Sequence, residues 1–147
     1  MKRFLLVLLC LLIICVSALA DTVYVLCQPD SFVNVRAFPR KGAEITGYAE
    51  LGWQLETDGI RKNGYVKVSG YEGDAWIYAG YLTDCAVTVI TLKTQIVSKG
   101  RVACRRAING TRRKWLKDGT EVTIYALSDE WSITDKGFIK TQYLGVY

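Results

Sequence analysis

The sequence predicts an all-β chain in which one small antiparallel module occurs twice, behind a signal peptide. Short runs rich in β-branched and aromatic residues alternate with Gly, Asp and Asn, and no long amphipathic helix pattern follows the amino-terminal segment. Two stretches also end alike, "GDAWIYAGYLTDC" at 73–85 and "DKGFIKTQYLGVY" at 135–147. In each, an aromatic-Ile pair is followed by three residues and then Tyr-Leu. We therefore expect an internal repeat.

The amino-terminal segment has the layout of a secretory signal. Lys2 and Arg3 precede an apolar run over 4–16, and Ala18-Leu19-Ala20 supplies the small residues read at a cleavage site. We predict a signal peptide over 1–20 and a secreted or cell-surface chain with no transmembrane segment after cleavage. The apolar run is slightly short for a membrane-spanning helix. Retention of the segment as an anchor is the alternative.

The charge of the remaining chain is divided unevenly between its halves. Residues 21–85 carry 6 basic and 9 acidic side chains, a net charge of −3. Residues 86–147 carry 11 basic and 5 acidic side chains, a net charge of +6. Such an asymmetry indicates that the two halves present different surfaces to partners.

The β-rich runs follow one another at short intervals. "TVYVLC" at 22–27, "VTVITL" at 87–92 and "EVTIYA" at 121–126 are predicted strands. Asn63-Gly64, a favoured tight-turn pair, precedes a further strand in "KNGYVKV" at 62–68. Asp118-Gly119 and Lys136-Gly137 interrupt the second half in the same way. Strands this short indicate small antiparallel barrels or a sandwich.

The repeat extends over both halves. Val35-Arg36 corresponds to Cys104-Arg105, and Tyr48, four residues before a Gly, corresponds to Trp115. The aromatic-Ile…Tyr-Leu ending closes each copy. We therefore divide the chain into a first domain over 21–85 and a second over 86–147, lying close together because no linker-like stretch separates them.

The order of these repeated residues along the chain resembles that of the bacterial SH3-like (SH3b) family. Copy one matches through "VNVRAFPRKGAEITGYAELG" and "AWIYAGYL", with Ala75 where the family usually has Gly. Copy two matches through "DGTEVTIYA", "EWSI" and "GFIKTQYL", but has Cys104 for Val and lacks the Pro. The resemblance covers nearly all of the chain after residue 20. It implies two tandem small SH3-like barrels, each partly open and built from five to six strands.

A barrel of about sixty residues buries little surface, so each of its large apolar residues contributes a large share of its stability. We expect the two endings to fill the interiors, through Trp76, Ile77, Leu82, Phe138, Ile139 and Leu144. First and last strands lie side by side in SH3-like barrels, so the resemblance implies a disulfide between Cys27 and Cys85. Cys104, in the position of Val35, is interpreted as a buried thiol.

Catalysis is not expected from these residues. The chain contains no histidine, the commonest general base and metal ligand. Cys104 as a nucleophile would depend on Arg105 or Arg106 alone for activation. Acid pairs such as Glu72/Asp74 are interpreted as solvated turns. We predict a non-enzymatic protein with no metal and no cofactor.

Binding is the function that remains, and the resemblance implies peptidoglycan or an associated polymer as ligand. Shallow aromatic grooves suit such recognition. Trp53 and Tyr71 are the first candidates because the barrel pattern does not require them in the core, and Tyr48 and Trp115 are the second. Scattered surface aromatics are the alternative interpretation.

A basic cluster distinguishes the second copy. Arg105, Arg106, Arg112 and Arg113, with Lys114 and Lys117 nearby, are predicted to contact an anionic cell-envelope polymer or membrane surface. A solvated face is the alternative, and no nucleic acid is expected as partner because a stacking platform is not evident. A secreted adaptor or inhibitor that binds another protein, through an exposed strand edge or aromatic loops, is the second functional hypothesis.

Overall fold

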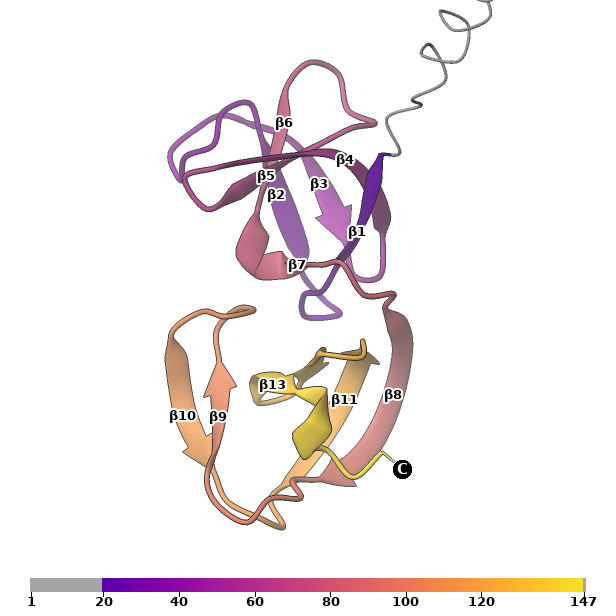
Figure 1. Cartoon of the computed structure of the whole chain (residues 1–147), viewed down its shortest axis with the longest axis vertical. Coiled ribbons are helices and arrows are strands. Elements are labelled where there is room, and N and C mark those ends of the chain that lie inside the picture. The colour runs from indigo at the N-terminus through magenta and orange to yellow at the C-terminus, as the bar shows by residue number, and fades with distance from the viewer. Residues whose placement is uncertain (1–19, 147) are drawn as a thin grey trace, which may run out of the picture.

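A computed structural model describes residues 20–146, so residues 1–19 of the predicted signal peptide lie outside the described residues. The described chain forms two antiparallel sheets, each curled into a small barrel, with one barrel above the other in Figure 1. The predicted fold class, an all-β chain of two tandem small SH3-like barrels, is confirmed.

The first barrel contains seven strands and one short 3-10 helix, with the sheet order β3-β2-β6-β5-β4-β1-β7. Its last strand returns to its first, with Tyr24 opposite Thr83 and Val25 opposite Leu82. The elements are β1 (Asp21–Val25), β2 (Phe32–Arg36), β3 (Ile45–Glu50), β4 (Gln54–Lys62), β5 (Tyr65–Val68), β6 (Ala75–Tyr78), η1 (Ala79–Tyr81) and β7 (Leu82–Thr83).

The second barrel repeats the order of the first six of these strands, with the sheet order β10-β9-β13-β12-β11-β8, and within the described residues it has no counterpart of β7. Its closing segment after the 3-10 helix meets the first strand through a single bridge between Ile96 and Leu144. The elements are β8 (Thr88–Gln95), β9 (Val102–Arg105), β10 (Arg112–Leu116), β11 (Glu121–Leu127), β12 (Trp131–Thr134), β13 (Gly137–Lys140) and η2 (Thr141–Tyr143). The matching sequence endings therefore form matching structure, β6–η1 and β13–η2.

The predicted turn at Asn63-Gly64 joins β4 to β5. Both residues have positive φ, 51° and 79°, and the flanking residues Lys62 and Tyr65 are paired. Two central residues with positive φ give the turn a twist that matches that of the flanking strands. Asn tolerates this conformation, and Gly adopts it without a steric cost, so the sequence determines the hairpin locally.

Each barrel has its own apolar interior. Ile77 and Leu82 belong to the first, and Ile139 and Leu144 belong to the second, as predicted. Neither isoleucine has exposed surface. Burying side chains of this size stabilises the fold by about 1.5–3 kcal/mol each, which is a large contribution for so small a barrel.

Trp76 and Phe138 are also buried, but they lie on the other face of their strands from Ile77 and Ile139. Successive side chains of a strand point to opposite faces, so the residue before each inward isoleucine points outward. Phe138 belongs to a third apolar cluster, which lies between the barrels. The expectation that Trp76 and Phe138 fill the interiors of their own barrels is therefore wrong, since neither belongs to the interior cluster of its barrel.

This third cluster joins the two barrels. Leu26, which has no exposed surface and follows β1, is its buried member from the first barrel. Its buried members from the second barrel are Ala126, Trp131, Ile133 and Phe138. Two hydrogen bonds accompany it, from Gln28 Nε2 to the Thr134 carbonyl at 3.0 Å and from the Ile108 amide to the Gly80 carbonyl at 2.8 Å. The barrels are therefore held in one orientation by a shared core.

Candidate functional site

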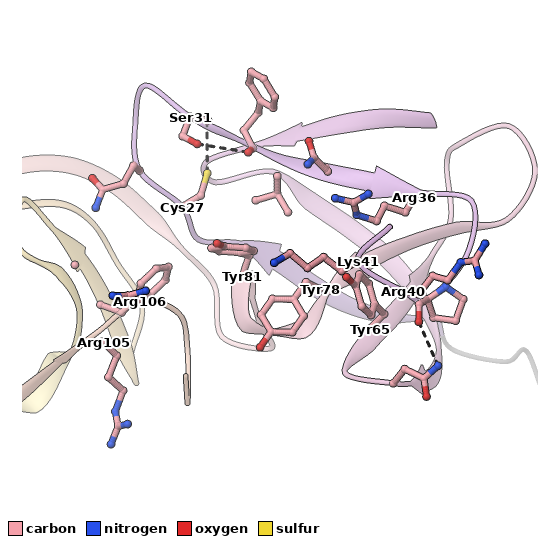
Figure 2. Close-up of a pocket in the computed structure, with 18 of the residues that line it drawn as sticks. Cys27, Ser31, Arg36, Arg40, Lys41, Tyr65, Tyr78, Tyr81, Arg105 and Arg106 are labelled. Atoms are coloured by element: carbon pink, nitrogen blue, oxygen red, sulfur yellow. Dashed lines mark hydrogen bonds between the residues drawn. The ribbon is translucent and has the colours of Figure 1, made fainter. Parts of the chain in front are cut away.

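A cleft of about 990 Å³ lies where the two barrels meet. From the first barrel it is lined by β2, by the loop that follows β2, and by tyrosines of β5, β6 and η1. From the second barrel it is lined by arginines of β9, β10 and their connecting loop and by the start of β13. Residues distant in sequence therefore share one surface, which Figure 2 shows in close-up.

Aromatic rings run across the cleft from one barrel to the other. Ring centroids of Tyr65 and Tyr78 are 5.7 Å apart, those of Tyr78 and Tyr81 are 5.9 Å apart, and those of Tyr81 and Phe138 are 6.1 Å apart. The first two contacts are edge-to-face and the third is tilted, which are favourable arrangements for aromatic pairs. Tyr78 is the most exposed of the four, at 42%, whereas Tyr65 and Phe138 are buried.

The charged side chains of the cleft are all cationic. The barrel-1 cations are Arg36, Arg40 and Lys41, and the barrel-2 cations are Arg105, Arg106 and Arg113. Within the described part of the chain, no Asp or Glu lines the cleft. The four ion pairs found among residues 20–146 involve Arg61, Lys67, Lys136 and Lys140 instead. The cleft is therefore a positively charged surface that suits an anionic ligand.

The two arginines of the repeat motif, Arg36 and Arg105, each donate a hydrogen bond to the loop that follows their own strand. Arg36 donates a hydrogen bond through Nη1 to the Ala43 carbonyl at 2.7 Å, and Arg105 donates one to the Gly110 carbonyl at 2.8 Å. In Figure 2 the Arg105 side chain accordingly points away from the tyrosines. These two guanidinium groups shape the walls of the cleft, while Arg40, Lys41, Arg106 and Arg113 are exposed.

The loop that carries Arg40 and Lys41 is fixed from the opposite side. Asn63, in the β4–β5 turn, donates a hydrogen bond through Nδ2 to the Pro39 carbonyl at 3.3 Å. Figure 2 shows Lys41 extending toward Tyr81 and Arg40 at the outer end of the cleft. The tight turn therefore also positions the basic loop.

The predicted aromatic candidates lie elsewhere. Tyr71 is half-buried over the first core and donates its hydroxyl to the Tyr48 carbonyl at 3.0 Å, and burial raises the pKa of its phenol. Tyr48 is exposed and packs edge-to-face on Phe32, with centroids 4.4 Å apart. Trp53 is exposed in the turn between β3 and β4. These three do not line the cleft. Tyr71 is thus a packing residue in the described structure.

The predicted basic cluster is divided by the structure. Arg105, Arg106 and Arg113 line the cleft. Arg112 does not; its guanidinium lies 4.5 Å from the ring centroid of the exposed Trp115. The pairing of β10 with β9 shifts register between Arg112 and Lys114, so Arg113 lies at a β-bulge, which turns the two neighbouring arginines in different directions.

Sequence reasoning missed half of the cleft. Arg36, Arg40 and Lys41 lie in the run "RAFPRK" at 36–41, which has three cations and no acid. The net negative charge of the first copy concealed this local run. Tyr65, Tyr78 and Tyr81 were missed because they occupy positions of the repeat at which an aromatic residue is also expected for packing.

The predicted disulfide between Cys27 and Cys85 is not present, because both are free thiols in the structure, as is Cys104. Strands β1 and β7 do pair, and the Leu26 amide continues their register by bonding the Tyr81 carbonyl. That register carries Cys27 toward Gly80, whereas Cys85 lies in the bend that follows β7, beyond the other end of the paired residues. The two cysteines therefore lie at opposite ends of the β1–β7 pairing. A disulfide requires Cα atoms within roughly 7 Å.

The two buried thiols, Cys27 and Cys104, do not have the character of activated nucleophiles. Burial, followed by the charge of Glu50, raises the pKa of Cys27 to about 11. Burial is also the main cause of the raised pKa of Cys104, whose thiol donates to the Lys136 carbonyl. Reactive cysteines have lowered pKa values instead. Among residues 20–146, no group of three His, Cys, Asp or Glu side chains is placed to hold a metal ion.

The described chain is an all-β protein of two small barrels with a basic, aromatic-lined cleft between them. Residues 20–146 contain no helix with the length and apolarity to cross a bilayer. No protein-family model matches the sequence. No curated protein matches it either.

Solved structures that are similar to the chain include NlpC1 and NlpC2 from Trichomonas vaginalis. NlpC1 has a TM-score of 0.37 and 18% identity over 87% of this chain and 46% of its own. NlpC2 has a TM-score of 0.37 and 16% identity over 87% of this chain and 48% of its own. This chain therefore spans less than half the length of either. The likeness is weak, so the interpretation of the site depends on this chain's own residues.

Proposed function

We propose that this chain is a secreted or cell-surface binding protein, without enzyme activity, that holds an anionic polymer of the cell envelope in the cleft between its barrels. Peptidoglycan with its associated polyanions is the target we favour. The observation that carries the proposal is the set of six cationic side chains in a cleft to which residues 20–146 contribute no carboxylate. Guanidinium groups bind phosphate and carboxylate oxygens through two parallel hydrogen bonds, so arginine-rich surfaces favour such ligands.

The location is proposed from the amino-terminal segment, whose charged start, apolar run and small residues have the order of a secretory signal. Non-enzymatic function is proposed because the sequence contains no histidine and the buried thiols have raised pKa values. Both proposals agree with a chain that binds a polymer outside the cytoplasm.

The test is co-sedimentation of the purified chain, residues 21–147, with bacterial sacculi. One preparation retains its anionic polymers, and a matched preparation has them removed by acid extraction. We expect binding to the first, abolished by extraction, and an affinity that falls steeply between about 50 and 500 mM salt because the contacts are electrostatic. Equal binding to both preparations, or binding indifferent to salt, would contradict the proposal.

A protein partner is the second candidate, and β8 is the observation in its favour. This strand lies at the edge of the second sheet and is exposed along nearly all of Thr88–Gln95. Val89, Ile90 and Leu92 are among its exposed side chains. An exposed apolar edge can pair with a strand of another protein. Pull-down from culture supernatant distinguishes the candidates, because recovery of a single protein species, with no binding to sacculi, favours a protein partner.

A further inference from the structure

We infer that the ligand of the cleft is a phosphate-linked glycan, bound as two anionic groups on either side of one uncharged sugar. The sugar lies on Tyr78, and the two anionic groups meet the barrel-1 and barrel-2 cations. This inference rests on the proposed function and narrows its ligand to one chemical class.

The cations of the cleft form two groups. Arg40 and Lys41 come from the loop after β2, and Arg106 and Arg113 come from the second barrel. Figure 2 shows Tyr78 and Tyr81 between Arg40 on one side and Arg106 on the other, with Lys41 extending toward Tyr81. A single small anion would occupy one group only. A ligand that engages both needs two charges with an uncharged unit between them.

One aromatic ring is available for that uncharged unit. Tyr78 is 42% exposed, whereas Tyr65 is 8% exposed and Phe138 is 3% exposed. Flat apolar faces of a ligand can lie on such a ring. The remaining rings pack against one another, so the cleft offers a place for one ring-sized unit.

The other lining residues favour a sugar over a nucleobase. Gln28, Ser31, Asn34 and Asn63 place side-chain amides and a hydroxyl in the same cleft. Gln28, Ser31 and Asn63 each donate one hydrogen bond to a backbone carbonyl. Their side-chain oxygens can still accept hydrogen bonds, which suits the many hydroxyls of a glycan. Single-stranded nucleic acids instead bind through successive stacked bases. One open ring among many polar groups is a poor match for that mode.

The distance between the two cation groups is set by the fold. Each group belongs to a different barrel, and the barrels are joined by Leu26 and by the Gln28 and Ile108 hydrogen bonds. The cleft therefore selects for the spacing of charges along the polymer. A rigid site of this kind binds a matching repeat with little cost of ordering.

The experiment compares three soluble probes of equal charge by calorimetry on the full mature chain. The probes are a glycosyl-phosphate oligomer, an inorganic polyphosphate and oligothymidylate. We expect the glycosyl-phosphate oligomer to bind about 10-fold or more tightly than polyphosphate, since stacking and hydroxyl contacts add to the charge contacts. Tyr78→Leu should lower affinity for the glycosyl-phosphate oligomer much more than affinity for polyphosphate, and so reduce this difference, and Tyr78→Phe should preserve most of it.

Two surface variants provide a test that does not depend on packing around Tyr78. Lys41→Ala and Arg113→Ala should each weaken binding of the glycosyl-phosphate oligomer by about 3- to 10-fold. Arg112→Ala is the matched control, since Arg112 is adjacent in β10 but stacks on Trp115. It should have no effect.

Each outcome has a separate meaning. Equal affinity for polyphosphate and the glycosyl-phosphate oligomer would overturn this inference while leaving the proposed function in place. Tightest binding of oligothymidylate would overturn the glycan class. A decrease of affinity in Arg112→Ala equal to that in Arg113→Ala would overturn the placement in the cleft. Absence of binding to all three probes, together with no binding to sacculi, would overturn the proposed function itself.

Discussion

The ring of Tyr81 packs against the ring of Phe138 with 6.1 Å between the ring centroids. Tyr81 closes the aromatic-Ile…Tyr-Leu segment of the first repeat, and Phe138 opens the same segment of the second. The duplicated segment therefore has two roles. Its Ile and Leu fill each barrel, while Tyr81 from one copy and Phe138 from the other join the barrels and form the floor of the cleft.

Leu26→Ala should uncouple the unfolding of the two barrels. Truncation of a buried leucine costs about 2–5 kcal/mol, and this leucine contacts the second barrel through the shared cluster. Urea unfolding should show one transition in the wild type and two separable transitions in Leu26→Ala. Ile77→Ala, which affects the first interior alone, is the control and should also lower stability. Its affinity for ligands of the cleft should decrease less than that of Leu26→Ala.

The salt dependence of sacculus binding should identify the residues that contact the polymer. Removing one cation–phosphate interaction reduces the slope of log affinity against log salt, by about 0.7–0.9 for nucleic acids. Arg113→Ala and Lys41→Ala should reduce the slope, and Arg112→Ala should not. Co-sedimentation at several salt concentrations measures this directly. Equal slopes in all three variants would show that the bound polymer does not lie in the cleft.

Alkaline pH should weaken the fold through Cys27. Burial raises the pKa of this thiol from 9.0 to about 11, so the folded state favours the neutral form. The resulting stabilisation is present below pH 9 and disappears as pH rises from 9 to about 11. The unfolding free energy of the wild type should fall more steeply over this range than that of Cys27→Ala. Parallel curves for the two proteins would contradict the prediction.

Thiol labelling should report three free cysteines. Cys85 is half-buried and should react with iodoacetamide in the folded protein, whereas Cys27 and Cys104 are buried and should react only after unfolding. Mass spectrometry without reductant should therefore find three labels on the unfolded mature chain. A peptide linking Cys27 to Cys85 would show that the register of β1 and β7 is wrong.

The local features of the fold could be predicted because their causes lie in neighbouring residues. Asn63-Gly64 sets a turn by its own backbone preferences, and alternation in "FVNVR" places Val33 and Val35 inside. The repeat also located Ile77 and Ile139 correctly. By contrast, which face Phe138 covers depends on the surface of the other barrel that packs against it, and no local pattern encodes that.

The cleft could be predicted only in part. Arg105, Arg106 and Arg113 were identified from their charge, but their partners Arg40 and Lys41 lie more than sixty residues earlier. Their meeting depends on how the barrels dock, which is determined by Leu26 and its neighbours. The disulfide prediction failed for a related reason, because adjacency of two strands does not specify the register between them.

The guanidinium groups of Arg36 and Arg105 each tie the start of a loop to a carbonyl near its end, across separations of seven and five residues. The backbone path depends on this tie more than on the side chains between its ends. The intervening positions are therefore free to diverge after duplication without disturbing the strands. Two barrels of similar construction can in this way present a basic loop that recognises one part of a ligand and a different loop that recognises another.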